Sequence, residues 1–177
     1  MRKLQQIYNF IYKKVSNIQQ IVLFLILFGI AILVFIQVVL RYLLNAPLMG
    51  IEELLLFPTI WLYTIGNANS ALERNLLSAP VILSFIKEPK KYKITKIVIS
   101  LISFFMSCWL TYWGYHYFLY SIRVQKLSAI LYIPLVYAES FIFIGFFLVS
   151  VYIFIEVIDN ISKPLSEYQE SIKKGNA

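Results

Sequence analysis

The sequence predicts an all-α integral membrane protein with four transmembrane helices and both termini in the cytoplasm. The first observation is composition: 60% of the 177 residues are hydrophobic and only 14% are charged, which is more apolar side chain than a globular core of this size can bury. The other two observations are long uncharged runs and the uneven distribution of Lys and Arg around them. Because the runs do not alternate apolar and polar residues, helices are favoured over the strands of a closed barrel.

Four runs are long enough to cross a bilayer, whose core of about 30 Å needs about 20 helical residues. Residues 15–40, 54–72 and 97–122 contain no charged side chain, and residues 127–155 contain only Glu139. We expect spans at about residues 18–41, 53–72, 97–122 and 134–158, within one membrane domain of residues 1–177. A cleaved signal peptide is not expected, because the first run continues for too long and lacks a small-residue cleavage site.

Basic residues lie almost entirely on one side of the expected spans. With the N-terminus in the cytoplasm, thirteen of the sixteen Lys and Arg residues fall inside, and only Arg41, Arg123 and Lys126 fall outside. This asymmetry is typical of cytoplasmic loops. The net charge of +7 is therefore interpreted as a topology signal and an attraction to membrane phospholipid. No nucleic-acid partner is expected, because no basic segment outside the membrane is interleaved with stacking aromatics.

An apolar stretch at residues 76–86 follows the second expected span and is too short to cross the membrane. Together with the basic segment after it, this stretch predicts an amphipathic cytoplasmic arm at about residues 76–96, broken at Pro89, with apolar side chains toward lipid and lysines toward headgroups. A plain basic loop is the alternative. The lysines of the arm are Lys87, Lys90, Lys91, Lys93 and Lys96.

No pattern of catalytic or metal-binding residues is found. The chain has one histidine and one cysteine, and it lacks the motifs H-E-x-x-H, G-x-x-x-x-G-K-[ST] and G-x-S-x-G. An enzyme is therefore not predicted, and neither a metal nor a cofactor is expected. Cys108 lies alone within the third run and is interpreted as a small packing residue. Internal repeats and interrupted helices, which are typical of carriers that work alone, are also missing.

Two ionisable residues, His116 and Glu139, lie inside the expected spans. With a fourth helix that starts near Pro134, both fall within about two turns of the outer surface. A carboxylate in lipid needs a partner, so we interpret them as a structural hydrogen bond or as a contact with another subunit. A proton or ion relay is one alternative, and a Glu139 that simply reaches outer water is another.

Charged residues also flank the first outer turn, within the stretch RYLLNAPLMGIEELL at residues 41–55. Arg41 ends the first expected span, and Glu52 and Glu53 begin the second. We expect the arginine to face a glutamate across the turn and to clamp the two helices, because an ion pair at the membrane surface loses less hydration than one at the midplane. An ion or substrate site is the alternative.

The same stretch resembles a known family. An Arg-Tyr pair at the end of the first helix, a short turn with asparagine and proline, the Glu-Glu pair, and then Trp61 and Gly66 resemble the small membrane subunit of tripartite ATP-independent periplasmic (TRAP) transporters, the DctQ-like family. The resemblance extends from Gln37 through the basic arm and more loosely into the last helix. The chain departs from the family pattern at Gly50, where an aromatic residue is usual, and at residues 75–76, where a histidine is usual.

The resemblance implies a role beside partners in the bacterial inner membrane. In this family a large multispanning subunit contains the sodium and substrate sites and moves as an elevator, while a periplasmic substrate-binding protein delivers an organic acid of sialic acid or C4-dicarboxylate type. The small subunit is then a static scaffold. Its implied structural or interface residues are Arg41, Glu52, Glu53, Trp61 and Gly66, and His116 and Glu139 join this set because of their position inside the expected spans.

Two other classes of function stay open at this stage. One is a self-sufficient small oligomeric channel or carrier that uses His116 and Glu139 as its path. The other is a four-helix membrane enzyme or haem-binding subunit, although one histidine cannot supply paired axial ligands. Solute flux through the purified chain by itself distinguishes a channel from a scaffold.

Overall fold

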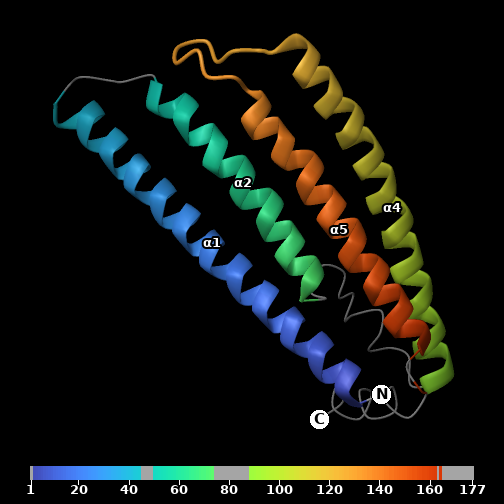
Figure 1. Ribbon diagram of the computed structural model, residues 1–177. Helices are drawn as coiled ribbons and strands as arrows, with labels where there is room; N and C mark the ends of the chain where they lie inside the picture. Colours follow the sequence, from blue (N-terminus) through green and yellow to red (C-terminus); the bar gives the residue numbers. More distant parts are fainter. Residues whose placement is uncertain (1, 45–49, 74–87, 163, 165–177) are drawn as a thin grey trace.

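The structure, a computed structural model, describes residues 2–44, 50–73, 88–162 and 164. Its helices are α1 (Arg2–Tyr42), α2 (Gly50–Leu72), α4 (Pro89–Val124) and α5 (Val136–Ser162) (Figure 1). Within these described ranges there is no β-strand, and an isolated bridge between Leu127 and Pro134 closes the loop between α4 and α5. The prediction of an all-α chain is confirmed.

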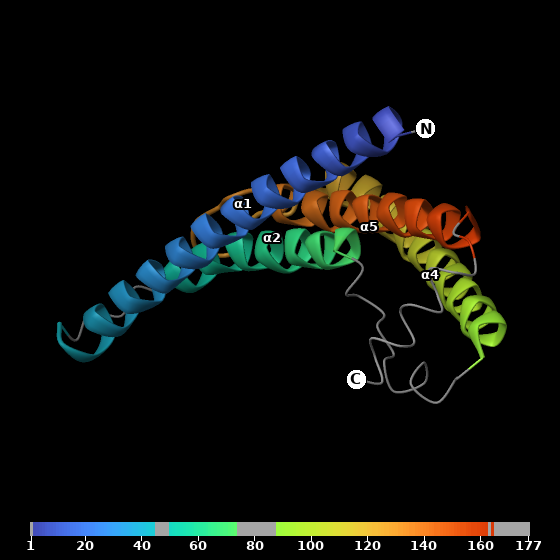
Figure 2. The same cartoon turned by 90° about the horizontal axis from the view of Figure 1, so that it is seen from below.

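The helices form a row in the order α1, α2, α5, α4, because α1 packs on α2, α2 on α5, and α5 on α4 (Figure 1). Seen from below, α1 and α4 are inclined to the two central helices, so that the row fans out instead of closing into a bundle (Figure 2). A row that is one helix thick buries side chains only along its seams. Large apolar side chains such as Phe24 on α1 and Phe105 on α4 therefore stay exposed.

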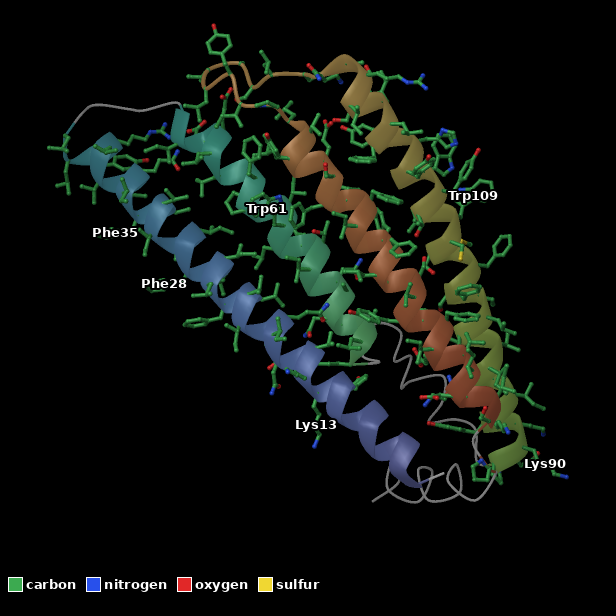
Figure 3. The ribbon with its side chains drawn as sticks, viewed as in Figure 1. Lys13, Phe28, Phe35, Trp61, Lys90 and Trp109 are labelled. Carbon is green, nitrogen blue, oxygen red and sulfur yellow. The ribbon has the colours of Figure 1, made fainter. Side chains whose placement is uncertain are left out.

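Helices that follow one another along the chain run in opposite directions, so each of the two edges of the row, where the helices begin and end, has four helix ends (Figure 1). We call the end with Lys13 and Lys90 the basic end, and the end with the α4–α5 loop at residues 125–135 the loop end (Figure 3). α1, α4 and α5 are each long and apolar enough to cross a membrane. α2 is not, by composition, because Asn67, Asn69 and Ser70 make its last turns polar. Three of the four predicted spans thus correspond to helices that are long and apolar enough to cross a membrane, and the total of four spans stays a prediction.

Small residues close the seam between α4 and α5. The buried residues of α4 follow one another at intervals of seven, which places them on a single face of the helix: Ser100, Ser107, Gly114 and Ser121. The Gly114 Cα carries no side chain, and a Cβ there would lie 3.5 Å from the Cα of Phe143 on α5. The two backbones therefore approach closely at Gly114.

A second close contact joins α5 to α2. A Cβ added at Gly145 would lie 2.7 Å from the Cβ of Thr64 and 3.3 Å from its carbonyl oxygen. From this point toward the basic end, the apolar core of the seam consists of small and branched side chains, namely Ala68, Ala71, Val149, Ile153 and Val157. Glycine at position 145 is what allows α2 to lie directly on α5.

The segment after Pro89 differs from the sequence prediction. Pro89 begins α4, as suits a residue without a backbone N–H at the first helical position, and the helix continues without interruption to Val124. Lys90, Lys93 and Lys96 therefore belong to the helix of the third span and not to a separate arm that ends at residue 96. At 1.5 Å per residue α4 is about 54 Å long, so its lysine-bearing turns project beyond a hydrocarbon core of about 30 Å. Residues 76–87 of the predicted arm, Lys87 included, lie outside the described residues.

Candidate partner interface

At the loop end, Glu53 holds the α4–α5 loop. Its carboxylate accepts hydrogen bonds from the backbone N–H groups of Ile130 and Leu131, both at 3.0 Å, and from the hydroxyl of Ser128. Glu53 lies in the first turn of α2, where a negative side chain also complements the helix dipole. One charged group thus satisfies several donors of a loop that is distant in sequence, and such charge-assisted hydrogen bonds are stronger than neutral ones.

The loop itself is a short hairpin with an apolar tip. The N–H of Ser128 donates to the carbonyl of Ile133 at 2.9 Å, and the N–H of Leu135 donates to that of Lys126 at 2.9 Å. Tyr132 has a φ of +54° and is 71% exposed, a conformation that costs free energy for a bulky residue unless neighbouring contacts hold it. The tip of this loop is therefore a preorganised surface.

Gly50, at the start of α2, lies directly against this loop. A Cβ at position 50 would lie 3.0 Å from Cδ2 of Leu131 and 3.4 Å from its Cγ. A larger side chain at this position would have to displace Leu131. The departure from the family pattern at residue 50 thus has a local physical reason, which is the space that the loop occupies.

The expected clamp between Arg41 and the glutamates is not formed. Among the described residues Arg41 pairs with neither glutamate, and its guanidinium lies 5.7 Å from the ring centre of Tyr42. Glu52 accepts a hydrogen bond from Nε2 of Gln37 at 2.9 Å instead. The two helices are therefore joined at this end by an amide-carboxylate contact one turn below Arg41. Arg41 is exposed, so its charge stays available to headgroups or to another subunit.

Trp61 and Gly66 lie on different sides of α2. The indole N–H of Trp61 donates to the carbonyl of Tyr137 at 3.3 Å, and its ring lies 4.7 Å from the ring of Phe141, so this side chain fastens α2 to α5 (Figure 3). Gly66 faces α1, where a Cβ would lie 3.7 Å from Cδ2 of Leu23. Their position between helices supports a structural role within the chain.

Glu139 has a hydrogen-bond partner, but His116 is not that partner. The carboxylate of Glu139 is buried and accepts a hydrogen bond of 2.7 Å from the hydroxyl of Tyr117 on α4. His116, the neighbour of Tyr117, points to another side of the helix and contacts the edges of Tyr112 and Tyr115 at 4.6 and 6.0 Å between ring centres. Adjacent residues on a helix do not share a face, so one carboxylate could reach only one of them. A path through His116 and Glu139 has no support from this geometry.

A polar cluster that the sequence did not predict lies nearer the basic end and is centred on Glu73. Its Oε1 accepts hydrogen bonds from Gln20 at 2.7 Å, Ser16 at 3.1 Å and Asn69 at 3.3 Å, while the hydroxyl of Tyr12 donates to the carbonyl of Leu72. The spacing of Ser16 and Gln20, four residues apart, was the available signal, because it places two donors on one face of the first helix. These contacts join α1 to the end of α2.

The sequence also did not predict the polar pairs between α4 and α5. Asn160 donates to Ser100 at 2.8 Å, both side chains being buried, and the hydroxyls of Thr111 and Ser150 lie 2.9 Å apart. At the basic end the ammonium of Lys93 reaches the carbonyl of Ile161 at 3.2 Å and so caps the last turn of α5. Polar contacts along this seam orient the helices that the small residues bring together.

The remaining predicted residues lie on the surface of the row. Lys91 forms an exposed ion pair of 3.2 Å with Glu88, a type of contact that contributes little to stability, and Lys90 is exposed as well. Cys108 is exposed on α4, so it does not pack inside this chain as expected. The part of the chain that the structure describes has no cluster of three or more His, Cys, Asp and Glu residues that could hold a metal ion.

The family model described as "Tripartite ATP-independent periplasmic transporters, DctQ component" matches residues 30–163, which is most of the chain. No curated protein matches the sequence closely enough to be reported. The matched segment includes α2, α4, α5 and the loop that Glu53 holds. The chain therefore belongs to the DctQ family, the small inner-membrane component of TRAP transporters.

Proposed function

We propose that the chain is the static scaffold of its TRAP transporter. Proteins of this family act with a large membrane subunit and a periplasmic binding protein. The observation that supports a scaffold is how the carboxylates are used: Glu53 holds a loop, Glu73 joins α1 to α2, and Glu139 joins α4 to α5. Each of these three carboxylates therefore makes its contacts within the chain. The solute is then bound and moved by the large subunit.

The loop end contributes a surface for docking of the binding protein. The loop tip exposes Ile130, Leu131 and Tyr132, and Glu53 holds its backbone in one conformation. A preorganised loop loses less conformational entropy on binding than a flexible one. Docking there requires the loop end to face the periplasm, which agrees with the lysines at the opposite end, since basic residues favour the cytoplasm.

The cargo follows from the family resemblance. We propose sodium-coupled import of an organic acid, of the sialic acid or C4-dicarboxylate type, with the sodium sites in the large subunit. In this arrangement the scaffold affects how much assembled transporter is present, and it does not affect which solute is chosen.

Reconstitution tests the scaffold directly. The chain is placed in liposomes by itself, with the large subunit, and with both the large subunit and the binding protein, and uptake of the acid is measured with and without a sodium gradient. We expect uptake only when the large subunit is present, and strong dependence on the binding protein. Sodium-driven uptake by the small chain without the large subunit would contradict the proposal.

A further inference from the structure

One face of α2 is exposed although α2 is a central helix of the row. Leu56 and Tyr63 are 45% and 72% exposed, and Asn67 is exposed as well. Intervals of seven and four residues place these three side chains on the same face of a helix. The amide of Asn67 makes no hydrogen bond with any described residue.

Two contacts define the depth of this face in the membrane. The ammonium of Lys93 lies at the level of Ile161, and Thr64 lies at the level of Gly145. Gly145 and Ile161 are about 24 Å apart along α5 at 1.5 Å per residue. Asn67 is one turn closer to the basic end than Thr64, so it lies about 20 Å from the level of Lys93. With lysines at the boundary of a hydrocarbon core of about 30 Å, Asn67 lies near the middle of that core.

An amide at this depth does not suit lipid. Hydrocarbon offers no hydrogen-bond donor or acceptor, so an exposed carboxamide near the midplane is strongly disfavoured unless another protein provides a partner. The exposed face of α1 is different, because Ile21, Phe24 and Phe28 are wholly apolar and suit acyl chains. At the same depth on α4 the exposed side chain is Phe105, which suits lipid equally well.

We propose that the face of α2 formed by Leu56, Tyr63 and Asn67 is where the large membrane subunit packs against this chain, and that the amide of Asn67 is hydrogen-bonded to a polar group of that subunit. The identity of the partner rests on the proposed function, whereas the position of the interface rests on depth and polarity. Because α2 is central, contact there leaves the apolar flanks of α1 and α4 to lipid. Asn67 is accordingly a buried interface residue in the assembled transporter.

Photo-cross-linking in the full complex tests the position of the interface. The photoreactive residue p-benzoyl-phenylalanine is placed at Tyr63 or Asn67, and at Phe24 and Phe105 as exposed controls of similar depth. We expect adducts with the large subunit from positions 63 and 67 and none from the two controls. Adducts from the controls but not from 63 and 67, or adducts of 63 and 67 with a second copy of this chain or with phospholipid only, would overturn the proposal.

The variant Asn67→Leu shows whether Asn67 faces a protein partner or lipid, because the two cases predict different effects on association with the large subunit. If Asn67 is hydrogen-bonded to the large subunit, Asn67→Leu weakens that association about three- to tenfold while the chain by itself unfolds at the same or a higher temperature. If Asn67 faces lipid, Asn67→Leu stabilises the chain and leaves association unchanged, which would refute the proposal. Phe24→Leu is the control and changes neither. Failure of the unaltered chain to associate with any large subunit would instead contradict the proposed function itself.

Discussion

The hydroxyl of Tyr117 donates a hydrogen bond of 2.7 Å to the buried carboxylate of Glu139, and this contact joins α4 to α5 in the half of the row near the loop end. Removal of the donor leaves an acceptor of high charge density without a partner where water has little access. Tyr117→Phe should therefore lower the free energy of unfolding by about 0.5–2 kcal/mol. The measurement is thermal unfolding of the detergent-solubilised chain. His116→Phe is the matched control, and an equal loss in that variant would show that His116 also supports Glu139.

Gly145 should tolerate no side chain. Its missing Cβ would lie 2.7 Å from the Cβ of Thr64, so Gly145→Ala has to push α2 away from α5, at a cost of about 1–3 kcal/mol. Gly29→Ala is the control, because no atom lies within 4 Å of a Cβ at that position and alanine favours the helix. Thermal unfolding of both variants is compared with that of the unaltered chain. A destabilisation by Gly29→Ala but not by Gly145→Ala would contradict the observed seam.

Glu53 and Glu52 should differ in their effect on the loop. Glu53→Gln removes the charge and leaves one acceptor oxygen beside an NH₂ donor, so the backbone N–H groups of Ile130 and Leu131 donate to a weaker, neutral acceptor. We expect their hydrogen exchange in lipid nanodiscs to become several-fold faster. Glu52→Gln is the control, since Glu52 contacts Gln37 instead. Unchanged exchange in Glu53→Gln would mean that the hairpin holds its shape without the carboxylate.

Exchange of charge between Arg41 and Glu53 should not restore a damaged complex. The two residues form no ion pair in the structure, and Glu53 is committed to loop donors that an arginine cannot satisfy. Arg41→Glu combined with Glu53→Arg should therefore co-purify with the large subunit no better than Glu53→Arg by itself. Recovery of the complex in the double variant would instead support the ion pair between Arg41 and a glutamate that the sequence predicted.

The side on which each end of the row lies can be determined with cysteine labelling. After Cys108→Ser, a cysteine at Tyr132 in the loop end should react with a membrane-impermeant thiol reagent added to the periplasm, whereas a cysteine at Glu88 in the basic end should not. Both positions are exposed in the structure, so access depends on the membrane. Labelling in the reverse pattern would invert the proposed orientation.

The sequence by itself determined the properties that depend on hydropathy, charge and the order of residues along the chain. Length of the apolar runs, the lysines beside them and the ordered residues from Arg41 to Gly66 predicted an all-α membrane protein and its family, and both predictions are confirmed. Such properties survive any rotation of a helix about its axis. The α2 helix was the weak case, because its apolar run ends in Asn67 and Asn69, and its span stays a prediction.

Only the tertiary structure decided which side chains meet. Glu53 does not pair with Arg41 but binds a loop about 75 residues away in the sequence. Glu139 accepts a hydrogen bond from Tyr117 and not from His116, which is the residue next to Tyr117. Contacts of this kind depend on the rotation and depth of each helix, and a rotation of 100° per residue is enough to exchange one partner for another. Rotation and depth are set by the closest packing, here Gly145 on Thr64 and the small residues of α4 on α5. No sum of hydropathy or charge along the chain contains that information, because packing joins residues that are distant in sequence.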